Sequence, residues 1–190
     1  ILQYPNLCRD YFSLVQHTID VYMDPLLSLD AALFLALSQS LTYGLHDTEP
    51  YVQSTALRSL FSLGKFRLEN AEHAGFRAQL EASPALLRDH LSDVFTSLLR
   101  GDFATAQLDA CADALLALAF CDLEFYQQLV DNVAKHMPDA QVRERLVAAV
   151  VNILNPNLEQ SLPRDNRKRF QDNVRSFARE VGTFLLKDGE

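Results

Sequence analysis

Apolar residues recur at intervals of three and four along almost the whole chain, and this helical period is the feature that most constrains the fold. The last stretch shows it most clearly, through Phe170, Val174, Phe177, Val181 and Phe184. Such spacing aligns the five side chains on one face of an α-helix. Around that face stand the basic residues Arg164, Arg167, Lys168, Arg169, Arg175 and Arg179. We therefore expect an amphipathic helix over 163–187 that caps a stack of helices.

Earlier segments repeat this period between residues that start and end helices. Asp30 and Asp122 suit N-caps, and Gly101 suits the end of a helix. In the first segment one face is expected to hold Leu7, Tyr11, Leu14, Val15, Thr18 and Ile19. The segment near 104–120 is rich in Ala and Leu, which indicates close neighbours on more than one side. The expected helices cover about 5–23, 31–45, 50–63, 84–100, 104–120, 123–136, 140–153 and 163–187.

Taken in pairs, these helices begin near Asn6, Pro50, Ala104 and Gln141, in steps of 44, 54 and 37 residues. Helical-hairpin repeats of the HEAT or armadillo kind recur at about 40–47 residues. The longest step contains an expected polar spacer over 65–82, with a short helix from Phe76 to Leu80. The predicted fold is all-α: an α-α superhelix of HEAT-like antiparallel helical hairpins, with about eight helices. A compact eight-helix bundle is the alternative.

We expect residues 1–190 to form a single HEAT-repeat-like helical domain, which is a fragment of a longer chain. The net charge is −8, and it is unevenly distributed: residues 164–190 carry a local +2 and the preceding residues −10. An acidic body argues against nucleic acid as the main ligand, because phosphate binding needs clustered Lys and Arg. It is compatible with basic protein partners. No apolar run is long enough to predict membrane insertion.

The sequence does not predict an enzyme. Its five histidines are scattered, and the pair His46–Asp47 is interpreted as a loop histidine beside a capping carboxylate. Asp109 and Asp113 stand four residues apart, where two acids could share a proton or bind a metal, but the solvated face of an amphipathic helix is the favoured interpretation. No phosphate-binding, nucleophile-elbow or zinc motif is present. We therefore expect no catalytic residue, no metal site and no cofactor.

The basic residues of the last helix are the candidates for protein binding. These are Arg167, Lys168, Arg169, Arg175 and Arg179. Three uses are open for them: pairing with the acidic body of the same chain, which is the favoured interpretation; contact with an acidic protein partner; and, ranked last, contact with nucleic acid or a membrane.

Two phrases resemble a known family. The first is YPNLCRDYFSLV, with Tyr4, Pro5, Leu7, Cys8, Tyr11, Phe12 and Leu14. The second is NRKRFQDNVRSFAREV, with Asn166, Arg167, Arg169, Phe170, Asn173, Phe177, Arg179, Glu180 and Val181. Together they resemble the C-terminal end of nuclear transport receptors of the importin-β superfamily, in the exportin-4 and exportin-7 group. Between the two phrases only the hydrophobic pattern is similar.

The resemblance implies a HEAT-repeat superhelix that binds the Ran GTPase in its GTP form, protein cargo and Phe-Gly nucleoporins. It also implies a receptor that shuttles between nucleus and cytoplasm. In that superfamily the main Ran contacts lie in N-terminal repeats, so no Ran-binding or cargo-binding residue is assigned to a position in this sequence. The expected function is a non-enzymatic scaffold for Ran-GTP-dependent nuclear export. The alternative is a stand-alone all-α adaptor or regulatory module, and a metal-carboxylate helical enzyme ranks third.

Overall fold

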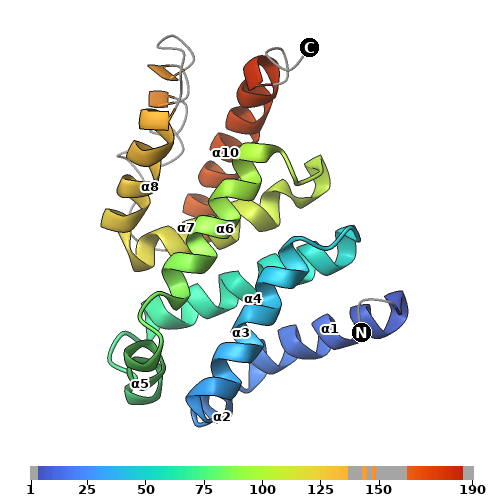
Figure 1. Cartoon of the computed structure of the whole chain (residues 1–190), viewed down its shortest axis with the longest axis vertical. Helices are drawn as coiled ribbons and strands as arrows, with labels where there is room; N and C mark the ends of the chain where they lie inside the picture. The colour runs from blue at the N-terminus through green and yellow to red at the C-terminus, as the bar shows by residue number, and fades with distance from the viewer. Residues whose placement is uncertain (1–3, 137–142, 145–146, 149–161, 186–190) are drawn as a thin grey trace.

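The computed structural model describes residues 4–136, 143–144, 147–148 and 162–185, and every regular element in them is helical (Figure 1). The elements are α1 (Pro5–Val21), α2 (Met23–Leu27), α3 (Ala31–Leu45), α4 (Pro50–Glu69), α5 (Ala74–Ala82), α6 (Leu86–Arg100), the short 3₁₀ turn η1 (Thr105–Gln107), α7 (Leu108–Cys121), α8 (Leu123–His136) and α10 (Arg164–Leu185). Seven of the expected helices are therefore present. The remaining one, over 140–153, lies outside the described residues except for 143–144 and 147–148, which are helical.

The long helices lie in two rows. One row runs through α1, α4, α7 and α10, each in contact with the next, from the bottom to the top of Figure 1. The second row runs through α3, α6 and α8, and its members pack against α4 and α7 of the first row. Successive long helices from α1 to α8 alternate between the rows, and α3 packs against α4, α6 against α7 and α7 against α8, so that helices adjacent in the chain stack one after another. The predicted all-α superhelix of helical hairpins is confirmed.

The starts of the first three helix pairs agree with the prediction. The helices α1, α4 and α7 begin at Pro5, Pro50 and Leu108, close to the expected pair starts. The fourth pair start, expected near Gln141, lies outside the described residues. Among the described helices α10, which begins at Arg164, packs beside α7 through its apolar seam, and Phe170 of that seam is fully buried.

Local sequence signals start and end several helices as expected. The Asp30 carboxylate accepts a hydrogen bond from Ala32 N at 2.9 Å at the start of α3. Asp122 does the same for Phe125 N at 2.9 Å at the start of α8. Gly101 ends α6 with a φ of 74°, a left-handed conformation that favours glycine.

The predicted polar spacer over 65–82 is mostly helical, so that prediction is wrong in its extent. α4 continues to Glu69, and α5 occupies Ala74–Ala82, which includes the expected short helix from Phe76 to Leu80. Phe66 and Phe76 stack with their ring centroids 6.0 Å apart, and Phe76 is almost fully buried. Gln79 of α5 donates hydrogen bonds to the carbonyls of Leu27 and Leu29, at 3.1 and 2.9 Å. These two hydrogen bonds span 52 and 50 residues of the chain, and the local polar composition does not show them.

The buried face of α1 also differs from the prediction. Its core side chains are Cys8, Phe12, Val15 and Ile19. Leu7 and Leu14, which were expected inside, are 51% and 64% exposed. Both sets have helical spacing, so the period alone could not choose between them; the position of the neighbouring helices decides.

The contact between α4 and α7 is close because small residues meet there. α7 contacts α4, α6, α8 and α10, which confirms the expectation of neighbours on more than one side. A methyl group on Gly64 of α4 would lie 3.0 Å from Ala117 Cβ and 3.2 Å from the Ala117 carbonyl carbon. The backbones of the two helices therefore leave no room for a side chain at Gly64.

A buried polar cluster joins the two helices α3 and α6 of the second row. His90, only 2% exposed, places Nε2 2.6 Å from Ser38 Oγ and Nδ1 3.4 Å from Thr42 Oγ1. Thr42 Oγ1 also donates to Asp93 Oδ2 at 3.0 Å. Burial lowers the pKa of His90 to about 4, with the Asp93 carboxylate acting in the opposite direction. The imidazole is therefore neutral at pH 7.

Replacing Gly64 with Val should destabilise the protein by about 1–3 kcal/mol, because the added side chain must displace the backbone of α7. Urea unfolding followed by circular dichroism measures the change. Lys65→Val, at an exposed position of the same helix, should change stability by less than about 0.5 kcal/mol. Equal effects of the two substitutions would contradict the close approach of α4 and α7.

The His90 pKa predicts a loss of stability in acid. Because the folded pKa of about 4 lies below the unfolded value of 6.5, protonation favours the unfolded chain. This contribution is complete above pH 6.5 and is lost as the pH falls toward 4, by up to about 3 kcal/mol. Urea midpoints between pH 7.5 and 4.5 should fall less steeply for His90→Gln than for the unsubstituted protein. His17→Gln, at an exposed position, should follow the unsubstituted protein.

Candidate protein-interaction surface

The basic helix α10 is held to the rest of the molecule by its apolar seam. Phe170 and Val174 are fully buried, and Phe177 is nearly so. All three belong to the core, and α10 contacts α7 and α6. The described part of the seam therefore packs inward, whereas the side chains of Val181 and Phe184 lie outside the described residues.

Arg167 connects α10 to both α7 and α4. Its Nε donates to Asp113 Oδ1 of α7 at 3.0 Å, and its Nη2 donates to the other oxygen of the same carboxylate. The guanidinium also lies over the ring of Phe61 of α4, 4.5 Å from its centroid. The hydrogen bonds that Arg167 donates to the Asp113 carboxylate raise the pKa of Arg167. A bidentate ion pair combined with stacking on an aromatic ring fixes the orientation of the Arg167 side chain. Lys could not reproduce this geometry.

Arg175 makes the second link, two turns farther along α10. Its Nη2 lies 2.5 Å from Asp109 of α7, and its Nη1 donates to Asp172 Oδ1 at 3.1 Å. The two aspartates of α7, four residues apart, thus face the two arginines of α10. Gln171 Nε2 also donates to Asp113 Oδ1, at 3.0 Å. The favoured interpretation of the basic helix, pairing with the acidic body, holds for Arg167 and Arg175.

The remaining basic candidates lie at the surface. Lys168, Arg169 and Arg179 are all exposed. Arg179 donates within its own helix, from Nε to the Arg175 carbonyl at 3.3 Å and from Nη2 to Ser176 Oγ at 3.4 Å. The five candidates are therefore divided into two that bind the body and three that face solvent.

A polar groove lies beside the Arg167–Asp113 pair. It has a volume of about 450 Å³ and is lined by Gln16 of α1, Ser54, Arg58 and Phe61 of α4, Asp109 and Asp113 of α7, and Arg167 of α10. Sequence reasoning missed it because its lining comes from four helices far apart in the chain. The only local signal was the polar spacing of Ser54, Arg58 and Ser62 on α4. The groove presents both signs of charge to solvent.

Of the pair His46–Asp47 noted in the sequence, Asp47 has a structural role. The Asp47 carboxylate accepts from Glu49 N at 2.9 Å and from the Cys8 thiol at 3.7 Å. It thus caps the turn before α4 as expected. Among the described residues, no three His, Cys, Asp or Glu side chains are grouped closely enough to hold a metal ion. Within the same residues, no helix is both long enough and apolar enough to cross a bilayer.

The fold places this chain in the class of all-α proteins built from stacked helical hairpins. No family model matches the sequence, and no solved structure matches it. Curated relatives do match it. The chain is 23% identical to Ran-binding protein 16 of Drosophila melanogaster over 198 residues, which cover 95% of the chain. It is also 23% identical to Ran-binding protein 17 of Homo sapiens over 204 residues, which cover 100% of the chain. The match spans 18% of the length of each relative. This chain is thus distantly related to both proteins over essentially its whole length.

Removing one member of the Arg167–Asp113 pair should destabilise the protein. Arg167→Met should cost about 1–3 kcal/mol, because it leaves the largely buried Asp113 carboxylate without its main partner. Arg169→Met, on the exposed side of the same helix, should cost less than about 0.5 kcal/mol. Urea unfolding gives both values.

A double-mutant cycle with Asp113→Asn isolates the contribution of the pair itself. A coupling free energy of about 1 kcal/mol between Arg167 and Asp113 is expected, and it should fall at high salt. Purely additive effects would contradict the role of this pair in holding α10.

Proposed function

We propose that this chain is a scaffold segment of a nuclear transport receptor of the importin-β superfamily, in the exportin-4 and exportin-7 group, and that it acts in Ran-GTP-dependent export of protein cargo. The observation that carries the proposal is the relation to two proteins named as Ran-binding, along essentially the whole chain. The phrases at 4–15 and 166–181 support the same assignment. We also propose that the hairpins are HEAT repeats and that residues 1–190 form one domain of a longer chain.

The proposed mechanism is non-enzymatic. Stacked hairpins contact only their neighbours, so a receptor built from them can bend and present long surfaces to protein partners. In this proposal Ran, cargo and Phe-Gly nucleoporins bind through the longer receptor, which shuttles between nucleus and cytoplasm. No cofactor takes part.

Within this segment, the exposed Lys168, Arg169 and Arg179 are the proposed contacts for an acidic protein surface. Arg167 and Arg175 act instead on the fold, because their guanidinium groups bind the aspartates of α7. Arg167 and Arg175 would contribute to partner binding indirectly, by holding α10 in position.

The test of this function is nucleotide-dependent binding of Ran. The full-length protein that contains this chain should retain GTP-loaded Ran in a pull-down at least about tenfold better than GDP-loaded Ran, as expected for an export receptor that assembles with the GTP form. Equal retention of the two forms, or no retention of either, would contradict the transport function and favour the adaptor alternative.

A further inference from the structure

Helix α1 has one flank in contact with its neighbour in the row. On that flank Ser13 Oγ and Tyr51 Oη of α4 share a hydrogen bond of 2.9 Å. About two turns farther along α1, Ser62 of α4 donates to Asp20 Oδ1 at 2.6 Å. This flank is thus polar and is covered by α4.

The opposite flank of α1 is apolar and faces solvent. Leu7, Leu14 and Val21 are 51%, 64% and 56% exposed, and they follow one another at intervals of seven residues. Two helical turns separate such positions, so the three side chains form a line along the helix. Leu7 and Leu14 each stand one position before a buried residue, Cys8 and Val15, and a step of one residue turns the helix by about 100°, which takes the line away from the core-facing side.

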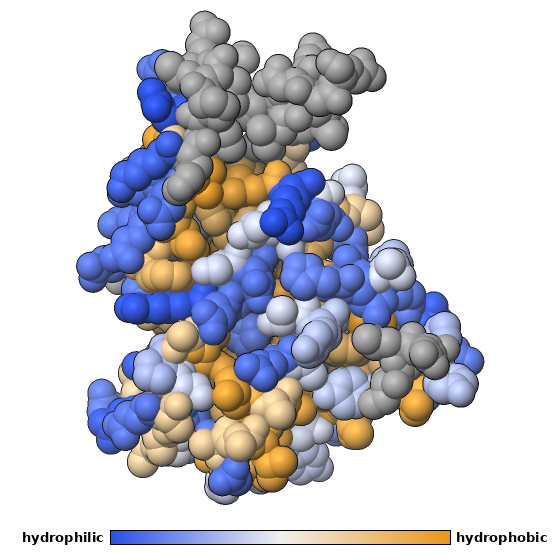
Figure 2. All heavy atoms as spheres, in the orientation of Figure 1, coloured by the Kyte–Doolittle hydropathy of each residue, from blue (hydrophilic) through white to orange (hydrophobic). Residues whose placement is uncertain are grey.

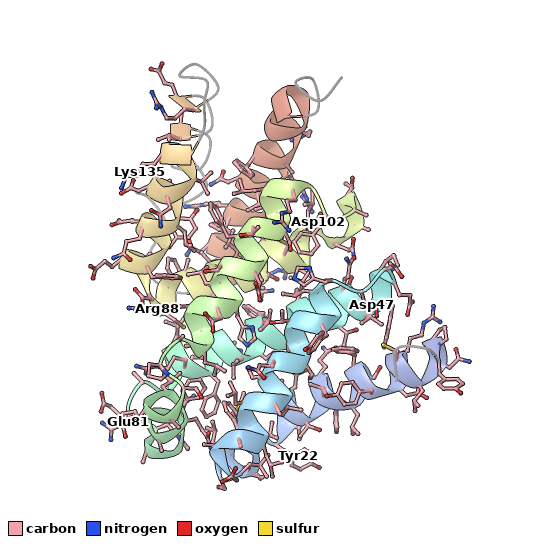
Figure 3. All side chains as sticks on the ribbon, viewed as in Figure 1. Tyr22, Asp47, Glu81, Arg88, Asp102 and Lys135 are labelled. Atoms are coloured by element: carbon pink, nitrogen blue, oxygen red, sulfur yellow. The ribbon has the colours of Figure 1, made fainter. Side chains whose placement is uncertain are left out.

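The apolar line continues onto α3. Tyr11 of α1 donates from its hydroxyl to Ser40 Oγ of α3 at 2.9 Å, which places these sides of the two helices together. Leu33, seven residues before Ser40 on the same side of α3, is 61% exposed. Tyr22, labelled in Figure 3 at the end of α1, is also exposed. Figure 2 shows apolar side chains gathered at this lower end of the molecule, over α2 and the start of α3.

The two middle members of the row have neighbours on both flanks. α4 lies between α1 and α7, and α7 lies between α4 and α10. In the part of the chain that the structure describes, α1 packs extensively against one member of its row, α4. A contiguous exposed apolar face of this kind marks an interaction surface in a folded protein.

We propose that the face formed by Leu7, Leu14, Val21 and Leu33 is the docking surface for a further helical hairpin of the same, longer polypeptide. That hairpin would continue both rows, with one helix beside α1 and the other beside α3, as α4 and α6 do on the other side. The length of the relatives supports this occupant, because the matched region accounts for only 18% of each of them. The inference rests on the proposed function only in taking the chain as a segment of a longer receptor.

Cysteine labelling tests whether the face is covered. Leu14→Cys should react with a maleimide at least about tenfold more slowly in the full-length protein than in the isolated 190-residue chain, since covering helices restrict access. Glu72→Cys, in the exposed turn between α4 and α5, should react at the same rate in both. The native thiols of Cys8 and Cys111 are buried, and the unsubstituted protein gives the background rate.

A second variant separates the possible occupants. Leu14→Arg should leave the unfolding midpoint of the isolated chain unchanged, because Leu14 is exposed there, and should lower that of the full-length protein. Asp10→Arg, at an exposed position of the same helix, should be neutral in both. Equal labelling of Leu14→Cys in the two proteins would overturn the proposal, even if full-length protein still binds GTP-loaded Ran. The labelling rate of the isolated chain could also fall as its own concentration rises, in parallel with dimer formation measured by ultracentrifugation. That result would mean that a second copy covers the face, and it would overturn the proposal.

Discussion

The packing of α4 against α7 is the contact on which the rest of the fold depends. Each of these helices has neighbours on both flanks of its row and a second row across it, so few of their faces remain for solvent. Close approach is possible because Gly64 meets Ala117, and a side chain at Gly64 would strike the α7 backbone. Small residues thus bring the helix axes together, and the larger side chains around them, such as Leu60 and Leu115, fill the space on either side. The other helices stack outward from this centre.

Two kinds of interaction hold α10 at the end of the row, and they do different things. Burial of Phe170, Val174 and Phe177 is nondirectional and supplies attraction. The pairing of Arg167 with Asp113, and of Arg175 with Asp109, has a fixed geometry and sets the rotation and register of the helix. This arrangement explains why a basic helix follows an acidic body in the sequence. It also divides the basic residues, since those that bind the body are not available to a partner in the same geometry.

Much of the architecture could be predicted from local pattern. The helical period, the caps at Asp30 and Asp122 and the end at Gly101 are properties of neighbouring residues, and they located seven of the long helices. The full extents of α4 and α5 were not predictable in this way, because Phe66, Phe76 and Gln79 are held by contacts that local pattern does not show. For the candidate surface, the sequence identified the basic residues as a set. It could not say which of them pair internally, because Asp113 lies 54 residues from Arg167 in the chain.

The sequence by itself determined that this protein is a succession of amphipathic helices with an acidic body and a basic end, because the helical period and the charge are local quantities. Only the tertiary structure decided which side of each helix is buried. In α1 two apolar lines compete, and the one with Phe12 and Val15 is buried because α3 and α4 lie over it, whereas the line with Leu7 and Leu14 remains at the surface. Burial depends on which helix lies alongside, and no local spacing contains that information.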